Sequence, residues 1–174
     1  MVGSSKITLR PLQLIDSTSI AFHANNRLVS DNLRDVFPYP YTETDAIQFV
    51  QMASAKLPTT EFAISVSDEV IGVAGIILKE DIYRNNGEIG YWIGQRYWGE
   101  GVGTWVVGEL VRIAFEDFTL YRVYAEVFEN NIASARVLEK NGLIKEATLK
   151  NAIIKNGVRQ NLNIYSIINP KQFL

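Results

Sequence analysis

One stretch of the chain, residues 87–104, places a strand pattern, several glycines and a helix pattern directly after one another. β-Favouring side chains predict a strand over residues 88–94, and apolar residues three or four apart predict a helix over residues 102–118. Glycines occupy positions 99, 101 and 103. The N–H groups of a first helical turn are unpaired, and glycine lets several of them point at one anion. The stretch therefore predicts a phosphate-binding loop.

The spacing of these glycines excludes two common phosphate-binding motifs. A P-loop needs a lysine directly after its last glycine, and no lysine follows here. A dinucleotide-binding fingerprint needs Gly-x-Gly-x-x-Gly near the start of a βαβ unit. Here the glycines alternate strictly and more than eighty residues precede them.

The same stretch resembles the acetyl-CoA-binding motif of the GNAT superfamily of N-acetyltransferases, Gln/Arg-x-x-Gly-x-Gly/Ala. Two registers fit. Arg96 with Gly99 and Gly101 matches the pattern literally, whereas Trp98 with Gly101 and Gly103 better matches where the helix begins. We favour the second register. It is similar to the Tyr-Trp-Gly-x-Gly sequence of the RimJ/RimL-like branch, which acetylates the N-termini of ribosomal proteins.

Residues 130–143 resemble a second GNAT motif, Asn-x-x-Ser followed by a short helix that ends in Glu-Lys-x-Gly-Phe, with Leu143 in place of Phe. The residues alone predict a helix here, because Asn130 or Asn131 is a preferred N-cap and Gly142 a preferred C-terminal stop. The family resemblance implies that Asn131 contacts the pantetheine arm of the cofactor. Capping and ligand contact are compatible, since they can use different atoms. The resemblance covers nearly the whole chain.

The composition, 47% hydrophobic and 21% charged, is ordinary for a globular protein. The net charge of −2 offers no basic field for nucleic acid or an anionic membrane, and no apolar run is long enough to cross a membrane. With no Cys and one His, no metal site is expected. The first six residues lack the apolar core of a signal peptide. We expect a single domain over residues 1–174 in the cytoplasm, with no nucleic acid, membrane or metal partner and with a homodimer left open.

The remaining patterns give an order of elements that resembles the GNAT fold. Helices are predicted from Asp16 or Ser17 to about residue 25, and from Thr42 or Thr44 to residue 56. Hairpin turns are predicted at residues 67–69 and 156–157. Further strands are expected at 7–12, 61–67, 70–79, 122–128, 143–154 and 158–168. The resemblance implies an α/β (α+β) fold, a mixed and mostly antiparallel sheet of about seven strands flanked by about four helices.

Acetyl transfer to an amine needs an unprotonated nitrogen, a donor at attack distance, and groups that stabilise the oxyanion and the leaving thiolate. Glu88 can accept the amine proton directly or through water, although it is equally well an ordinary charged residue near a strand end. The resemblance places Ser134 near the leaving sulfur, as a hydroxyl donor to the thiolate; bonding within the first turn of its helix is the alternative. Leu138 occupies the place of the tyrosine acid of many GNAT enzymes, so that acid is not available here.

The resemblance also implies where the two substrates bind. By position, the backbone of Trp92, Ile93 and Gly94 holds the thioester end of the cofactor. The backbone of the glycine-rich loop holds the pyrophosphate: Gly99, Glu100, Gly101, Val102, Gly103 and Thr104. Loops that the family uses for the acceptor contain Asp31, Arg34, Tyr39, Tyr41 and Tyr83, for which solvent-facing packing is the alternative. The only histidine, His23, lies away from every motif in the sequence and is interpreted as a structural or surface residue.

These observations predict an acetyl-CoA-dependent N-acetyltransferase that acts on a primary amine by direct attack, without an acetyl-enzyme. A protein N-terminal amino group is the favoured acceptor by resemblance, and a polyamine, an amino sugar or another small amine is the next. A non-catalytic acyl-CoA-binding module and a nucleotide-binding protein remain as alternatives from other classes.

Overall fold

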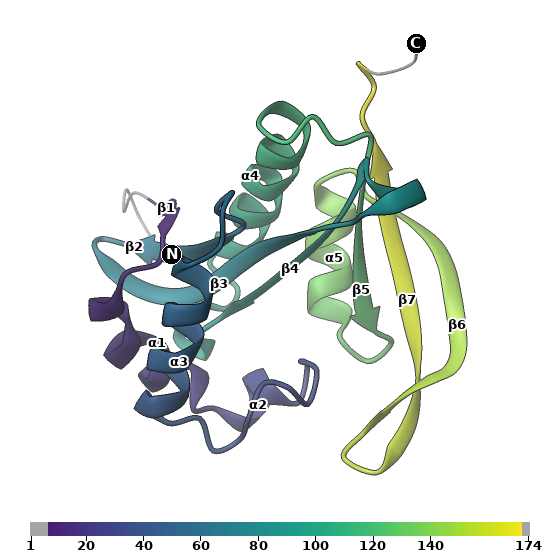
Figure 1. Ribbon diagram of the computed structural model, residues 1–174. Coiled ribbons are helices and arrows are strands. Elements are labelled where there is room, and N and C mark those ends of the chain that lie inside the picture. The colour runs from purple at the N-terminus through teal and green to yellow at the C-terminus, as the bar shows by residue number, and fades with distance from the viewer. Residues whose placement is uncertain (1–6, 172–174) are drawn as a thin grey trace. The chain divides into compact units, whose positions relative to one another are not determined.

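The computed structural model describes residues 7–171, and these contain one seven-stranded sheet with the order β1-β2-β3-β4-β5-β7-β6 (Figure 1). The pairs β1–β2, β2–β3, β5–β7 and β6–β7 are antiparallel, and β4–β5 is parallel. The predicted mixed, mostly antiparallel sheet is confirmed. Its strands are β1 Ile7–Pro11, β2 Glu61–Val66, β3 Glu69–Leu78, β4 Asn86–Ile93, β5 Arg122–Phe128, β6 Ile144–Lys155 and β7 Val158–Ile168.

Five α-helices and three short 3-10 turns connect these strands in the described residues. The helices are α1 Ser17–Ala24, α2 Arg27–Ser30, α3 Glu43–Ser54, α4 Val102–Glu116 and α5 Ile132–Lys140. The 3-10 turns are η1 Leu14–Asp16, η2 Asp81–Tyr83 and η3 Gln95–Tyr97. The sequence predicts α1, α3, α4 and α5 within a few residues of these bounds.

The chain groups into two compact units. Unit 1 is formed by the described residues within Met1–Gly75 and Tyr91–Val106, and unit 2 by those within Ile76–Gly90 and Val107–Leu174. The single domain over residues 1–174 remains a prediction.

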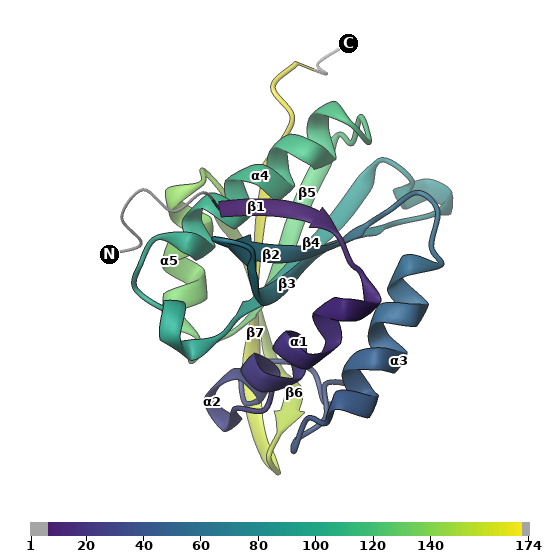
Figure 2. The same cartoon turned by 90° about the vertical axis from the view of Figure 1, so that its left-hand side faces the viewer.

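Helices α1 and α3 lie side by side in unit 1, and β1 runs along β2 (Figures 1 and 2). The buried faces of α1, α3, β2 and β3 form one apolar core, and Leu12, which follows β1, and Tyr41, which precedes α3, complete it. The core residues are Leu12, Ile20, Ala24, Tyr41, Ala46, Val50, Ala53, Ala63, Val70 and Val73.

Helix α3 begins at a capping box, which decides between the two N-caps that the sequence allows. The Thr42 hydroxyl accepts from Asp45 N–H at 3.2 Å, and the Asp45 carboxylate accepts from Thr42 N–H at 2.8 Å. These two bonds satisfy backbone donors that the helix itself leaves unpaired. Thr42, rather than Thr44, is therefore the N-cap.

Both predicted hairpins form, and their turns have the expected backbone. Ser67 and Asp68 join β2 to β3 with φ of 48° and 69°, and Asn156 and Gly157 join β6 to β7 with φ of 51° and 75°. Two consecutive positive φ angles are typical of a type I′ turn, whose twist matches that of the strands it joins.

Helix α2 is the element that the sequence does not predict. It has four residues, too few for a periodic apolar pattern, and lies in the stretch 26–41 that otherwise has no regular structure. Its N-terminus is specified by one side chain, because Asn26 accepts a hydrogen bond from Leu28 N–H at 2.9 Å.

In the part of the chain that the structure describes, no helix combines the length and the apolar character needed to cross a membrane. The first six residues, which the expectation about a signal peptide concerns, lie outside the described residues.

Candidate active site

The loop between β4 and α4 has the backbone geometry of an anion-binding turn. Gly99 and Gly101 have φ of +78° and +83°, a region in which a side chain is strained, and a Cβ at either position would meet nothing within 4 Å. Helix α4 begins at Val102, with its first backbone bond from Trp105 N–H to the Gly101 carbonyl at 3.1 Å. The N–H groups of this first turn have no acceptor within the helix, and they carry the positive end of its dipole. The helix start agrees with the favoured register of the glycine motif.

Trp98 connects the start of this loop to the end of β4 by a hydrogen bond. Its indole Nε1–H donates to the carbonyl of Ile93, the last residue of β4, at 2.7 Å. The bond spans η3 and ties the residue before Gly99 back to the strand end. The sequence gives Trp98 a motif position but no role, because the bond depends on how η3 turns the chain.

The backbone at the end of β4 is closely packed against β3. Gly94 N–H donates to the Ile71 carbonyl at 2.7 Å. A Cβ at Gly72 would lie 2.2 Å from the Trp92 carbonyl oxygen, so only glycine fits there. Of the backbone groups predicted to bind the thioester, Gly94 N–H and the Ile93 carbonyl are thus already bonded within the protein. A thioester at this strand end would be bound by other groups.

His23 is a buried residue in contact with the end of β4, which fits the structural role, one of the two that the sequence allows, and brings it close to a motif from which it is distant in the sequence. Its side chain is 2% exposed. A Cβ at Gly94 would lie 2.4 Å from His23 Nδ1, which shows how closely the ring approaches this glycine. A glycine and a histidine far apart in the sequence carry no local signal of this contact.

The Glu69 carboxylate joins His23 to η3. One oxygen lies 2.8 Å from His23 Nε2, and the other accepts from the Tyr97 hydroxyl at 2.8 Å. The hydrogen bond from His23, and then the one from Tyr97, hold the pKa of Glu69 below its ordinary value. Burial and the bond to Glu69 raise the pKa of Tyr97. Both shifts favour the hydrogen-bonded pair of ionised Glu69 and neutral Tyr97.

Glu88, the candidate base, is buried in unit 2 beside a lysine and a tyrosine. Its Oε2 lies 2.8 Å from Lys79 Nζ and 3.4 Å from the Tyr124 hydroxyl. Burial opposes the charged form of Lys79, yet its bonds to Glu88 and Tyr124 raise the pKa of Lys79 above its ordinary value. The sequence gives no indication of this cluster, because its members come from the ends of three strands.

The parallel pairing of β4 and β5 ends at Glu88. The paired residues are Asn86 with Arg122, Gly87 with Val123, and Glu88 with Tyr124. Strand β4 continues beyond Glu88, but no later residue of β4 pairs with β5 in this register. A Cβ at Gly90 would meet nothing within 4 Å.

Asn131 caps α5, as one of the two predicted alternatives. Its Oδ1 accepts from Ser134 N–H at 3.1 Å. The Asn131 side-chain nitrogen and the Ser134 hydroxyl take no part in this bond. The cap therefore leaves the proposed contacts of both residues chemically available.

The residues predicted to bind the acceptor have different environments. Within unit 1, Arg27 brings two of them together, because its guanidinium lies 3.5 Å from the Asp31 carboxylate and 5.5 Å from the centre of the Tyr39 ring. Tyr41 belongs to the core, where burial raises its pKa to about 12. Arg34 is exposed in unit 1 and Tyr83 is exposed on η2 in unit 2.

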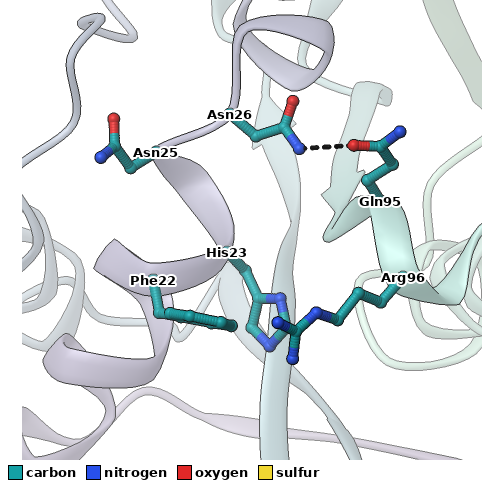
Figure 3. Close-up of a pocket in the computed structure, with 6 residues that line it drawn as sticks. All are labelled: Phe22, His23, Asn25, Asn26, Gln95 and Arg96. Atoms are coloured by element: carbon teal, nitrogen blue, oxygen red, sulfur yellow. Dashed lines mark hydrogen bonds between the residues drawn. The ribbon is translucent and has the colours of Figure 1, made fainter.

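A pocket of about 440 Å³ lies in unit 1 between the C-terminal end of α1 and η3 (Figure 3). A hydrogen bond of 2.8 Å from Asn26 Nδ2 to Gln95 Oε1 joins its two sides. The Arg96 guanidinium lies 4.8 Å from the centre of the Phe22 ring. The lining residues are Phe22, His23, Asn25, Asn26, Gln95 and Arg96. None of these is a residue that the sequence assigns to ligand binding, apart from Arg96 in the disfavoured register.

A family model described as an acetyltransferase (GNAT) domain matches residues 6–144. The chain belongs to the GNAT family of acetyltransferases. This GNAT protein is 37% identical over 177 residues to the probable N-acetyltransferase YjcK of Bacillus subtilis (strain 168), with 98% of each chain covered. The predicted family and enzyme class are therefore confirmed.

Solved structures share the fold of this GNAT protein. RimJ of Mycobacterium smegmatis, in complex with a CoA disulfide, superposes with a TM-score of 0.85 at 19% identity, over 97% of this chain and 84% of that chain. RimL, a ribosomal alpha-N-protein acetyltransferase in complex with coenzyme A, superposes with a TM-score of 0.84 at 21% identity, over 97% and 96%. Within residues 7–171 of the GNAT protein, no cluster of His, Cys, Asp or Glu has the arrangement of a metal site.

Proposed function

We propose that this protein transfers an acetyl group from acetyl-CoA to a primary amine, with a protein N-terminal amino group as the favoured acceptor. The observation that carries the proposal is the pair of left-handed glycines, Gly99 and Gly101, directly before the 15-residue helix α4. Such a turn binds the diphosphate of a cofactor through backbone N–H groups. The CoA complexes of RimL and RimJ, which have the same fold, support this choice of cofactor.

In this proposal the backbone of Gly99–Thr104 holds the pyrophosphate and the end of β4 holds the acyl arm. Successive N–H groups of a strand point to opposite edges. Since Gly94 N–H bonds to Ile71, the Ile93 N–H points to the other edge, and we assign it to the thioester oxygen. The Asn131 amide nitrogen, which the helix cap does not use, is assigned to the pantetheine arm.

The transfer proceeds by direct attack. The amine nitrogen adds to the thioester carbonyl carbon, the tetrahedral intermediate collapses with cleavage of the C–S bond, and the amine loses one proton while the thiolate gains one. Glu88 is assigned as the acceptor of the amine proton, directly or through water. Ser134 is assigned as the hydrogen-bond donor to the leaving sulfur, through its hydroxyl group.

The Lys79 ammonium beside Glu88 affects how the proposed base works. A neighbouring cation keeps a buried carboxylate ionised, which is the state that a base needs. The same cation lowers the affinity of the carboxylate for a proton. A water-mediated transfer fits this environment, because the carboxylate then need only orient the water and stabilise the charge that develops on it.

The acceptor is proposed to bind through the members of the predicted set that lie outside the core, Asp31, Arg34, Tyr39 and Tyr83. A carboxylate such as Asp31 suits an acceptor ammonium before deprotonation, and exposed aromatic rings suit the first side chains of a peptide. Tyr41 is assigned a supporting role, because its ring packs 4.7 Å from that of Phe37 inside the core.

A thiol-release assay with acetyl-CoA and a panel of amines tests the proposal. The panel contains short peptides with different first residues, polyamines and aminoglycosides. Each compound has a matched control in which its amino group is already acetylated. We expect release of CoA with at least one peptide and none with its acetylated control. Turnover with small amines alone would show that the acceptor is a small amine and not a protein N-terminal amino group. Binding of acetyl-CoA without release on any amine would identify a non-catalytic module instead.

A further inference from the structure

The side chains that line the pocket between α1 and η3 include several hydrogen-bond donors. The orientations of the Asn25 and Asn26 amides follow from backbone N–H groups, whose positions are not subject to an amide flip. Asn25 Oδ1 accepts from Tyr41 N–H at 3.2 Å, and Asn26 Oδ1 accepts from Leu28 N–H at 2.9 Å. Both amide oxygens are therefore turned toward the protein backbone.

The orientation of Asn26 fixes that of Gln95. Because Asn26 Oδ1 faces Leu28 N–H, its Nδ2 must be the group that meets Gln95, and Gln95 must present its oxygen at 2.8 Å. The Gln95 Nε2 is then the end of that amide that points away from Asn26. Figure 3 shows this bond, with the Gln95 nitrogen on its far side.

The aromatic members of the pocket are His23 and Phe22. His23 has Nε2 against the Glu69 carboxylate and Nδ1 against Gly94, so both ring nitrogens face other residues. Phe22 offers its ring to the Arg96 guanidinium. Glu69, the nearest carboxylate in this network, is not a lining residue, and its two oxygens accept from His23 and Tyr97.

What remains for a ligand is one guanidinium and two amide nitrogens. Within residues 7–171, Arg96, Asn25 Nδ2 and Gln95 Nε2 donate no hydrogen bond. Arg96 does contact the Phe22 ring, and its charge contributes to the lowered pKa of Glu69. A guanidinium with flanking amide donors is complementary to a carboxylate or a phosphoryl group. The volume of about 440 Å³ suits a small ligand or one end of a larger one.

We propose that this pocket binds the anionic group, a carboxylate or a phosphoryl group, of the acceptor. The acceptor is favoured over the cofactor as the source of the anion because the pocket adjoins the end of β4 through His23 and Gly94. The assignment to the acceptor rests on the proposed function, whereas anion binding itself does not. The substrate class is accordingly an amine that carries a carboxylate or phosphoryl group, such as an acidic peptide N-terminus.

Anion binding is tested without acetyl-CoA. The protein is titrated with succinate and with inorganic phosphate, and the side-chain amide signals of Asn25 and Gln95 are followed by NMR; succinamide is the neutral control. We expect saturable shifts with at least one anion and none with succinamide. Arg96→Met keeps the apolar stem of the side chain and is expected to weaken binding about tenfold or more. Arg84→Met, at an exposed arginine of unit 2, is the matched control and should bind as the wild type does.

Equal binding by wild type and Arg96→Met, or shifts of the same size with succinamide, would overturn the site. So would the absence of any shift with both anions. Thermal unfolding of Arg96→Met establishes that the variant is folded, and a folded variant is expected because Arg96 is exposed.

The source of the anion is tested by kinetics. Pairs of acceptors that differ only in a free carboxylate or its amide are compared, as are acetyl-CoA and acetyl-dephospho-CoA. We expect Arg96→Met to raise KM about tenfold for the acidic acceptor alone. A rise for acetyl-CoA that disappears with acetyl-dephospho-CoA would assign the pocket to the cofactor and overturn the acceptor assignment. No turnover with any acceptor would contradict the proposed function and the acceptor assignment, while a positive titration would still establish the anion site.

Discussion

The indole N–H of Trp98 donates a hydrogen bond of 2.7 Å to the carbonyl of Ile93. This bond joins the last residue of β4 to the residue that precedes Gly99, so it sets how the chain enters the glycine-rich loop. Trp98, which occupies the Gln/Arg position of the family motif in the favoured register, thus has a defined structural role in this protein.

Trp98→Phe removes that bond and keeps most of the ring. Loss of one neutral hydrogen bond costs about 1 kcal/mol, part of which is expected to appear as weaker acetyl-CoA binding because the loop is less well held. We expect KM for acetyl-CoA to rise about twofold to fivefold with a smaller change in kcat. Trp105→Phe, at a tryptophan on α4 that is 38% exposed, is the matched control and should leave KM unchanged. Equal effects of the two substitutions would exclude the role of the Trp98 bond.

Asn131 is predicted to act both as helix cap and as cofactor ligand, and two substitutions separate these roles. Asn131→Asp keeps an oxygen acceptor for Ser134 N–H and adds a negative charge at a helix N-terminus, so stability should be kept or improved. It removes the amide donor, so KM for acetyl-CoA should rise. Asn131→Ala should cost about 1 kcal/mol of stability as well. If Asn131→Asp has the wild-type KM, the residue is only a cap.

Glu88→Gln is expected to lower kcat while acetyl-CoA affinity is retained. Lys79→Met provides a sharper test of Glu88 as base. A buried carboxylate that loses its neighbouring cation is protonated more readily, so the acidic limb of the pH–rate profile should move to higher pH. Glu126→Gln, an exposed carboxylate on β5, is the control. An unchanged acidic limb in Lys79→Met would remove Glu88 from the mechanism.

Asp16 links stability to pH through its pair with Arg10. The two guanidinium bonds are 2.8 and 2.7 Å long, and the Asp16 side chain is 4% exposed. Burial raises the pKa of Asp16, but the bonds from Arg10 and from Gln13 N–H outweigh it, and the net pKa lies below the ordinary value. A carboxyl group with a lowered folded-state pKa contributes stability that is present above its unfolded pKa of about 4 and lost as the pH falls through the folded value.

Asp16→Asn is therefore expected to be destabilised near neutral pH by about 2–4 kcal/mol, because Arg10 loses its charged partner. The difference from wild type should shrink as the pH falls below about 4. Urea unfolding at a series of pH values measures it, with Glu80→Gln as the exposed control. A difference that does not depend on pH would contradict the assignment to the ion pair.

Local chemistry explains which parts of the molecule could be predicted from the sequence. The start of α4 follows from alternating glycines before an apolar period, the β6–β7 turn follows from Asn156-Gly157, and the start of α3 follows from a threonine cap, with Thr42 and Thr44 as the alternatives. In each case the determining residues are neighbours in the chain. The mixed, mostly antiparallel character of the sheet was predicted from the family resemblance, whereas the order of strands within it comes from the structure.

The parts that the sequence could not predict depend on residues that only the fold brings together. His23 reaches Gly94 and Glu69 from another element, and Glu88 contacts Lys79 and Tyr124, which are not its neighbours in the sequence. Tyr41 looks from its Pro-rich surroundings like a residue of an exposed loop, yet its ring is in the core. The pocket lined by Asn25, Gln95 and Arg96 has no motif at all, because its donor character arises from which side of each amide the backbone occupies.

Backbone N–H groups at Gly99–Thr104 are proposed to bind the cofactor diphosphate, and calorimetric titration of Gly101→Val with acetyl-CoA tests this most directly. Valine at this φ of +83° is strained by about 1–2 kcal/mol, and its Cβ meets no protein atom within 4 Å, so the variant should fold. Gly157→Val is the matched control, with a φ of +75°, the same open surroundings and a place in the β6–β7 turn. We predict acetyl-CoA affinity about a hundredfold lower for Gly101→Val and unchanged for Gly157→Val. Wild-type affinity in a folded Gly101→Val would contradict the account.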